Sequence, residues 1–378
     1  MLSRCASQAG FEVTILCWDR SGKRPPVMDG EAWKTVNISA PSTYDQGARQ
    51  GFGYVHFARR AFQWLRAHEW DIVHCNDLDT LPIGWAASRM TGRQVVFDAH
   101  EPYPEMQRER SPILYHVSRP LEWFLARRSS HIITVGEFMR RRFLSLTRNS
   151  VEVTVIGNWK DPDRFALPED VISRARADLK FPPHDLLVGF FGALYRTKPV
   201  LPLLEAAKMT GRVAVLIAGQ GEDAGLVKEW AERYPWVKFL GMVPSAQVEL
   251  YTRTCDAMYY GLDPNFEAAI YSTPNTLFSA ISAARPVLTT DCGELGEVVR
   301  TSGCGYLMPE LTTEACRDGL LALLDPAVRE KLEEGARFAS NQYSVAQAKR
   351  RLAAVYSGLS TKREMWQEQG ENSVSSGN

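Results

Sequence analysis

Short apolar runs alternate with helix-like segments along nearly the whole chain. Eleven runs have the composition of buried strands, at residues 11–18, 71–76, 94–100, 131–135, 151–158, 186–192, 213–219, 237–241, 256–262, 286–290 and 305–308. Segments with helical periodicity lie between them, among them 55–68, 201–209, 224–234 and 313–324. Runs rich in Val, Ile and Leu without polar alternation are typical of strands covered on both faces. The pattern therefore predicts an α/β protein with parallel sheets and right-handed crossovers.

About a dozen strands are too many for one doubly wound sheet, so we predict two Rossmann-like domains facing across a cleft. The seam is expected within residues 158–185, which are rich in Pro and Asp. The predicted parts are an N-terminal acceptor domain (1–160), a C-terminal nucleotide-sugar domain (161–343), a C-terminal helix packing back toward the N-terminal domain (344–360) and a disordered tail (361–378).

The N-terminus departs from this pattern. Residues 1–10 read as the end of a helix that feeds the strand at 11–18. A doubly wound domain normally begins with a strand and a glycine-rich turn before that helix. Two explanations are open: either the given start is internal to the gene product, or the N-terminal domain lacks its first strand.

Composition narrows the class of protein. The 378 residues are 45% hydrophobic and 23% charged, which is ordinary for a globular protein. No apolar run is long enough to span a bilayer and no signal peptide is evident. The seven cysteines are scattered and odd in number, so we predict reduced core thiols in a cytoplasmic protein, with no metal site.

Charge is unevenly distributed although the formal net charge is zero. Residues 1–160 carry an excess of five positive charges and the remainder an excess of five negative charges. A basic half favours an anionic surface or substrate there, and chance asymmetry is the alternative. Nothing indicates nucleic-acid binding.

Several motifs in order resemble GT-B glycosyltransferases of the large family 4 group. They are DIVHCNDLDTLPIGWAASRMTGRQVVFDAHEPYPEM (71–106), VEVTVIGNWKDPDRF (151–165), GALYRTKP (192–199), VLIAGQGED (215–223), VKFLGMVPSAQVELY (237–251), YSTPNTLFSAISAARPVLTTDCGELGEVV (271–299) and GCGYLMPE (303–310). The likeness covers the chain to about residue 357.

The resemblance implies transfer of a sugar from a nucleotide diphosphate-sugar to a glycan or lipid-linked acceptor, retaining, metal-independent and without a cofactor. The alternative is a catalytically impaired relative acting as a binding or partner subunit. An NAD-dependent oxidoreductase is disfavoured because no GxGxxG follows a strand with an acid downstream. A nucleotide-sugar epimerase on the same architecture stays open.

By this resemblance, the donor-binding residues lie mostly in the C-terminal half. A Pro-Asn turn enters a helix whose N-terminal amides hold phosphate. Thr276 replaces a common lysine, Ser279 replaces the expected glutamate, and Tyr271 stands where many relatives have a second glutamate. The predicted set is Gly192, Gly219, Met242, Val243, Pro274, Asn275, Thr276, Leu277 and Ser279.

The same resemblance implies the catalytic residues. Lys198, with Arg196 nearby, is expected to neutralise the donor diphosphate, since Ala193 replaces the family's arginine. His100, at the carboxyl end of a predicted strand, is expected to face the donor sugar. Asp77 and Glu101 are candidates for acceptor binding, whereas Asp79 is read as a helix N-cap and the Asp-x-Asp pattern is not read as a metal motif.

Residues 136–148 form a candidate basic helix. Met139, Phe143 and Leu146 make an apolar stripe next to three arginines. The helix could contact an anionic membrane on its cytoplasmic face, or its stripe could belong to the core, which is slightly favoured.

Overall fold

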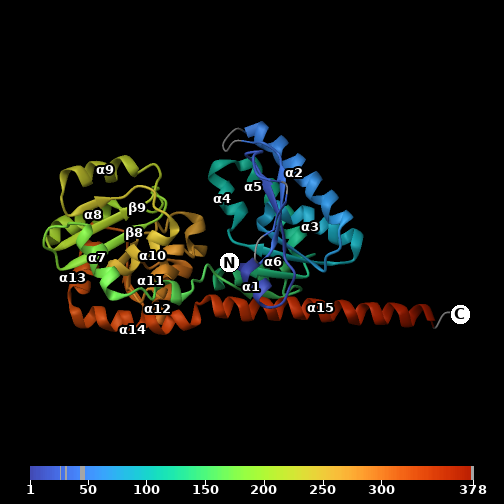
Figure 1. Cartoon of the computed structure of the whole chain (residues 1–378). Coiled ribbons are helices and arrows are strands. Elements are labelled where there is room, and N and C mark those ends of the chain that lie inside the picture. The colour runs from blue at the N-terminus through green and yellow to red at the C-terminus, as the bar shows by residue number, and fades with distance from the viewer. Residues whose placement is uncertain (26, 30–31, 43–46, 376–378) are drawn as a thin grey trace. The chain divides into compact units, whose positions relative to one another are not determined.

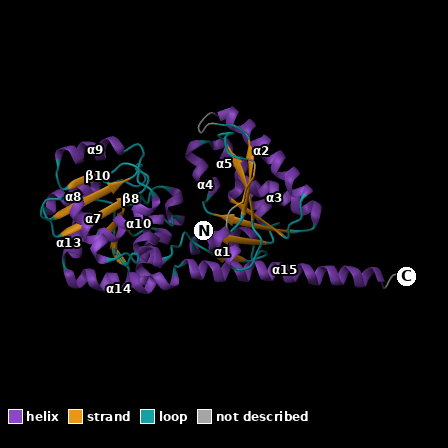
Figure 2. Cartoon of the chain, viewed as in Figure 1, coloured by secondary structure: helices purple, strands orange, loops and turns teal. Residues whose placement is uncertain are grey.

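The computed structural model describes residues 1–25, 27–29, 32–42 and 47–375. The chain divides into two compact units (Figure 1). Unit 1 consists of Met1–Ile156 and Ala348–Asn378, and unit 2 of Gly157–Gln347. Each unit has its own group of strands with helices around it (Figure 2). The prediction of two Rossmann-like α/β domains is confirmed.

Unit 2 contains a six-stranded parallel sheet in the order β10-β9-β8-β11-β12-β13. If its strands are renumbered from the first, this is the doubly wound order 3-2-1-4-5-6, which reverses between β8 and β11. The strands are β8 (Leu186–Phe191), β9 (Val213–Ala218), β10 (Val237–Phe239), β11 (Ala257–Tyr260), β12 (Val287–Thr290) and β13 (Gly305–Met308). All side chains of β8 and β9 are buried, as expected for strands covered on both faces.

Helices surround this sheet. They are α7 (Glu169–Asp178), α8 (Leu201–Thr210), α9 (Ala224–Arg233), α10 (Ser245–Thr254), α11 (Asn275–Ser282), α12 (Gly293–Ser302), α13 (Thr313–Leu324) and α14 (Pro326–Gln342), with 3₁₀ turns η1 (Pro162–Phe165) and η2 (Glu267–Tyr271). Each of α8 to α13 follows a strand, as right-handed crossovers require.

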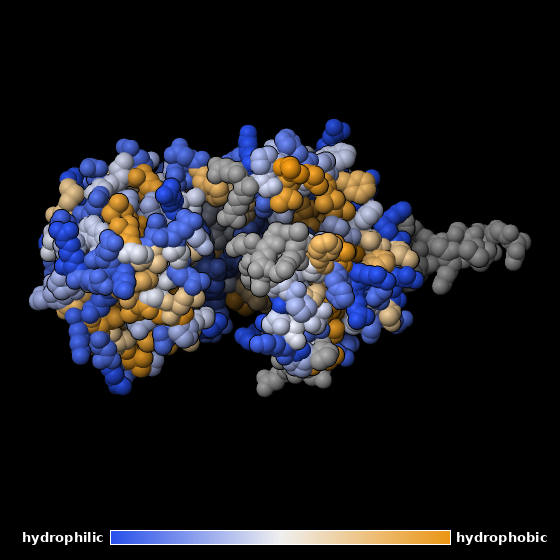
Figure 3. Space-filling model, turned by 90° about the horizontal axis from the view of Figure 1, so that it is seen from above, coloured by the Kyte–Doolittle hydropathy of each residue, from blue (hydrophilic) through white to orange (hydrophobic). Residues whose placement is uncertain are grey.

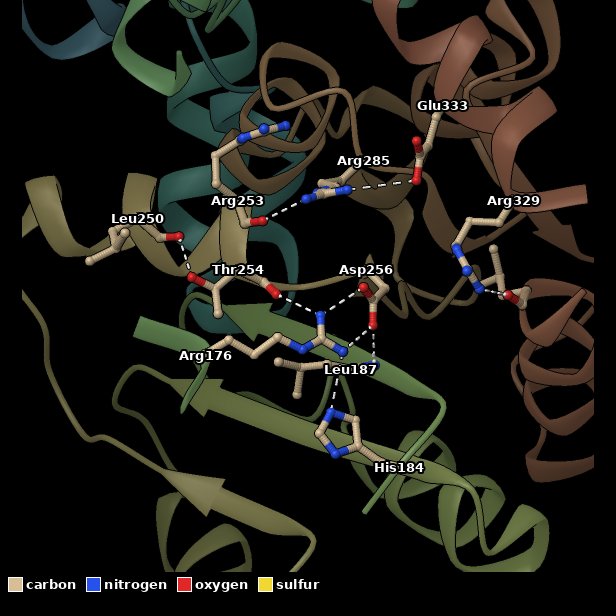
Figure 4. A network of polar contacts seen from close by, with 11 residues as sticks. Arg176, His184, Leu187, Leu250, Arg253, Thr254, Asp256, Arg285, Arg329 and Glu333 are labelled. Carbon is tan, nitrogen blue, oxygen red and sulfur yellow. Dashed lines mark hydrogen bonds and ion pairs between the residues drawn. The ribbon is translucent and has the colours of Figure 1, made fainter. Parts of the chain in front are cut away.

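A network of hydrogen bonds joins helix α7 to the amino ends of β8 and β11 (Figure 4). The Arg176 guanidinium donates two hydrogen bonds of 2.8 Å to Asp256, and Asp256 accepts another from the backbone N–H of Leu187. Burial opposes ionisation of Asp256, but the bonds from Arg176 hold its pKa below the usual value. Because Leu187 is the second residue of β8 and Asp256 directly precedes β11, the network joins α7 to the edge away from the strands' carboxyl ends.

Unit 1 contains two sheets. The first has the order β1 (Thr14–Asp19), β3 (Lys34–Ser39), β2 (Val27–Asp29). The second has the order β4 (Ile72–Asn76), β5 (Gln94–Ala99), β6 (His131–Thr134), β7 (Val153–Val155). All pairs are parallel except β2 with β3. Among the described residues, β1 and β4 do not pair. The strands β2 and β3 were not predicted.

The helices of unit 1 are α1 (Leu2–Gln8), α2 (Gly47–Ala67), α3 (Asp77–Thr91), α4 (Tyr103–Arg110), α5 (Pro112–Ala126), α6 (Glu137–Thr147) and α15 (Val345–Ser375). As predicted, α1 leads into β1. Helix α15, red in Figure 1, lies next to α1 and runs into the range expected as a disordered tail. Residues 376–378 lie outside the described residues.

Helix α6 carries the candidate membrane stripe of residues 136–148. Met139 and Phe143 are fully buried, and Leu146 is half-buried. Arg142 pairs with Glu105 and Glu122 at 2.9 and 2.6 Å. The stripe therefore belongs to the core of unit 1 and is not available to a membrane.

Two further sequence expectations can be compared with the structure. The seven cysteines carry free thiols, and all except Cys17 are buried. Within the described part of the chain, no helix combines the length and apolar character needed to cross a membrane.

Candidate functional site

Three loops of unit 2 are bonded together at the carboxyl ends of β8, β9 and β10. The N–H of Gly192 donates to the carbonyl of Ala218 at 3.0 Å, and the N–H of Gly219 donates to the carbonyl of Gly241 at 2.8 Å. Gly219 has a φ of +151°, and a Cβ there would collide with the carbonyl oxygen of Gly192. Only glycine permits this approach. The loops therefore form one backbone surface beside the point where the strand order reverses, where doubly wound folds bind ligands.

Helix α11 begins at the same place. Its N-cap is Pro274, and no side chain caps its first turn. Such an N-terminus presents unpaired N–H groups and the positive end of the helix dipole. The Thr276 hydroxyl donates to the carbonyl of Phe191 at 2.9 Å, which fixes the helix against the end of β8. The small residues of α11 are explained by burial, because Thr276 to Ser282 are all buried.

Two lysines lie near the loop that precedes α11. The Lys198 ammonium is 5.8 Å from the ring centre of Tyr260. Burial raises the pKa of Tyr260, and its interaction with Lys198 and hydrogen bonding to Ser272 oppose that rise. Tyr260 thus joins Lys198 to the loop before α11. The Lys160 ammonium donates to Asn275 Oδ1, in the first turn of α11, at 2.6 Å.

The sequence analysis did not predict Lys160 as a site residue. Burial and the charge of Arg164 lower its pKa. It lies two residues after Asn158, whose amide donates to the carbonyl of Thr273 at 3.2 Å. The signal available was its place in the motif VEVTVIGNWKDPDRF (151–165), which the resemblance includes. Lys160 places a positive charge next to α11, where Thr276 replaces the family lysine.

The structure sorts the predicted donor-binding residues. It brings Gly192, Gly219, Thr276 and Lys198 to one edge of unit 2. The side chains of Leu277 and Ser279 are buried, and Leu277 is fully enclosed, so only its backbone can meet a ligand. Met242 and Val243 follow Gly241, with Met242 exposed. Arg196 is exposed and makes no ion pair within the described part of the chain.

Unit 1 has a second polar cluster at the carboxyl ends of β4 and β5. Asp98 is completely buried, and its Oδ2 accepts from Nε2 of both His74 and His100 at 2.9 Å. The Tyr356 hydroxyl of α15 lies 2.8 Å from Nδ1 of His74. If His74 donates through Nε2, its Nδ1 accepts from Tyr356. Among the described residues, Oδ1 of Asp98 has no partner.

The electrostatics of this cluster favour a charged His100. Its hydrogen bond to Asp98 raises the pKa of His100 to about 9 against the effect of burial, and the charges of Asp77 and Glu101 add to that rise. Burial opposes ionisation of Asp98, but the two histidines lower its pKa to about 2. His100 is therefore an imidazolium at neutral pH, with about a third of its side chain exposed.

The two candidate acceptor residues, Asp77 and Glu101, flank His100. Asp77 Oδ1 accepts from the backbone N–H of His100 at 3.0 Å, and burial raises the pKa of Asp77 to about 6. Glu101 is exposed. The prediction that Asp79 caps a helix was wrong, because α3 begins at Asp77 with Asn76 as its N-cap and Asp79 lies in the first turn. Asp77 itself has a left-handed φ of +59°.

Two α/β units with parallel strands in one chain are the architecture of the GT-B fold, and the comparison with known families assigns the chain to the glycosyltransferases with that fold. The chain belongs to the group 1 type: residues 1–159 match the family described as "Glycosyl transferase 4-like domain", and residues 185–326 match "Glycosyl transferases group 1". The expectation of a GT-B glycosyltransferase of the group 1 type is confirmed.

One relative of known name agrees with this assignment. The chain is 26% identical to phosphatidyl-myo-inositol mannosyltransferase from Mycobacterium leprae (strain TN) over 150 residues. That match covers 39% of this chain and spans 39% of the relative's length.

Solved structures show the same fold. Sucrose-phosphate synthase from Thermosynechococcus elongatus has a TM-score of 0.79 at 17% identity, covering 96% of this chain and 92% of that one. HepE from Anabaena, in complex with UDP-glucose, has a TM-score of 0.68 at 18% identity, covering 91% and 99%.

Proposed function

We propose that the protein transfers a sugar from a nucleotide diphosphate-sugar to a glycan or lipid-linked acceptor, with retention of configuration and without a metal or cofactor. The observation that carries the proposal is the meeting of the uncapped α11 N-terminus, Lys198 and Lys160 at the switch point of unit 2. Amide N–H groups and ammonium groups suit a diphosphate, which accumulates negative charge as the glycosidic bond breaks.

Within this proposal each residue has a separate role. The loops at Gly192 and Gly219 admit the phosphates close to the backbone. Lys198 and Lys160 stabilise the leaving diphosphate, so the charge that a metal would supply comes from side chains. The His100 imidazolium donates to sugar hydroxyls and orients the reacting face.

The second candidate function is a catalytically impaired relative that binds the nucleotide without turnover. It is favoured by Ser279, a neutral residue where the resemblance expects a glutamate, and by Ala193 in place of an arginine. A hydroxyl holds a ribose more weakly than a carboxylate does.

The test is a panel of UDP-, GDP- and dTDP-sugars, with binding measured by calorimetry and product by mass spectrometry, with and without EDTA. We expect one nucleotide to bind, and sugar transfer that EDTA leaves unchanged. Lys198→Ala should lower turnover on the order of 100- to 1000-fold. Binding without any product would support the impaired relative, and no nucleotide binding would refute both readings.

A further inference from the structure

Helix α5 turns its apolar residues toward solvent. Ile113, Val117 and Leu121 recur every four residues and are 77%, 58% and 37% exposed. Leu114 and Trp123 on the same helix are also exposed. Ile113, Leu114, Val117 and Leu121 lie along one side of the helix, and Trp123 lies on the other flank of its exposed surface. We call these five exposed side chains the α5 face. A helix of a water-soluble unit normally turns such a stripe inward.

The inward side of α5 is held by polar contacts instead. Glu122 is 1% exposed and pairs with Arg142 of α6 at 2.6 Å. Ser118 is buried beside it, with Leu125 and Ala126 toward the helix end. The helix is therefore docked without any help from the α5 face. Glu122 is also the one acidic residue in α5, so the α5 face carries no carboxylate of its own helix.

Arginines surround the α5 face. Arg119 is exposed on the helix itself. The guanidinium of Arg127 lies 4.7 Å from the ring centre of Trp123, and that of Arg128 lies 3.7 Å from the ring centre of Phe124. Two shallow hollows beside the helix end are lined by arginines, one including Arg89 and Arg128 and the other Arg127, Arg128 and Arg148. Figure 3 shows a group of strongly apolar residues on the surface of this unit, next to hydrophilic ones.

We propose that the α5 face rests in the headgroup region of an anionic lipid bilayer. An apolar stripe flanked by cations is the pattern of a helix that lies in the plane of the membrane interface. With 15 residues, α5 is too short to span a bilayer. Anionic headgroups complement Arg119, Arg127 and Arg128, while the apolar side chains enter the acyl boundary.

A second copy of the chain fits this surface less well. In a two-fold dimer the same patch meets itself, so the arginines around one α5 face would lie against the arginines around the other. A bilayer meets no such repulsion. This inference does not depend on the proposed reaction, because vesicle binding requires neither donor nor acceptor.

The test is sedimentation of the full chain with vesicles of phosphatidylcholine alone, or of phosphatidylcholine mixed with phosphatidylglycerol. We expect binding only to the anionic vesicles, weakened by salt. The double variant Ile113→Asn/Val117→Asn should abolish it. The matched control, Val328→Asn/Phe338→Asn on the exposed side of α14, removes similar apolar side chains from unit 2 and should bind as the unchanged protein does.

The charges are tested separately. Arg119→Gln/Arg128→Gln should weaken binding about fivefold for each arginine removed, whereas Arg174→Gln, an exposed arginine of α7, should not. Thermal melts by circular dichroism establish that every variant is folded. The proposal is overturned if the chain ignores anionic vesicles, or if the α5 variants bind them like the unchanged protein. It is also overturned if light scattering shows a dimer that Ile113→Asn/Val117→Asn dissociates.

Discussion

Asp98 controls the charge of His100 although it has no exposed surface itself. One of its oxygens accepts hydrogen bonds from both His74 and His100. A carboxylate in that position stabilises the protonated imidazole of His100. The stability that His100 contributes is fully present below the ordinary histidine pKa of about 6.5. It is lost as the pH rises through about 9, where the folded His100 releases its proton.

Replacing Asp98 with Asn should remove this effect. We expect the pKa of His100 to fall from about 9 toward its ordinary value, because the hydrogen bond to a charged acceptor is lost. Imidazole resonances followed by NMR against pH measure the pKa directly. The decline in stability between about pH 6.5 and 9 should also disappear from pH-dependent unfolding. Asp170→Asn, at an exposed carboxylate of unit 2, is the control; an unchanged pKa of His100 in Asp98→Asn would contradict the argument.

Removing His100 should separate transfer from nucleotide binding. His100 belongs to unit 1, whereas the loops that we assign to the nucleotide belong to unit 2. We expect His100→Ala to lower the rate of sugar transfer on the order of 100-fold, with nucleotide affinity changed far less. Calorimetry and single-turnover kinetics on the same preparation make the comparison. Equal losses in both would show that the site had collapsed.

At the scale of elements, the loops of unit 2 depend on glycine. Gly219→Ala would place a Cβ against the carbonyl of Gly192 at a φ that only glycine adopts readily. We expect unit 2 to lose on the order of 1–3 kcal/mol of stability, together with nucleotide binding. Gly225→Ala in α9 is the control, because a Cβ there meets nothing within 4 Å. That variant should be neutral or slightly stabilising, and chemical denaturation with calorimetry distinguishes the two.

The elements that the sequence predicted best were the strands that lie in mostly apolar runs. All eleven apolar runs contain strands, because a Val- or Ile-rich run between polar segments has few other stable arrangements. The strands β2 and β3 were missed, since Lys34–Ser39 mixes polar and apolar residues and β2 is three residues long. Pairings across the chain could not be predicted: Tyr356 and His74 are 282 residues apart. Lys160 was missed for the same reason, because its partner Asn275 is 115 residues away.

At the scale of the whole molecule, α15 completes unit 1. Leu352, Val355 and Leu359 are buried, and Arg351 donates to the carbonyl of Val155 at 2.8 Å. Losing three such side chains costs roughly 5–8 kcal/mol, which is comparable with the stability of an ordinary domain. A chain that ends at residue 347 should therefore lose the thermal transition of unit 1 and keep that of unit 2.

Differential scanning calorimetry measures both transitions in one experiment. A chain that ends at residue 361 retains every α15 contact named above and should melt as the full chain does. Loss of both transitions in the shorter chain would instead mean that the two units unfold as one.

The interruption of unit 1 by unit 2 also sets an order of events during synthesis. The ribosome synthesises all of residues 157–347 before it adds Tyr356. At about 5–20 residues per second, the nascent His74 waits roughly 15 to 60 s for its partner. Unit 2 can thus finish folding first. Unit 1, most of which is translated earlier, stays accessible to chaperones until α15 has left the ribosomal tunnel.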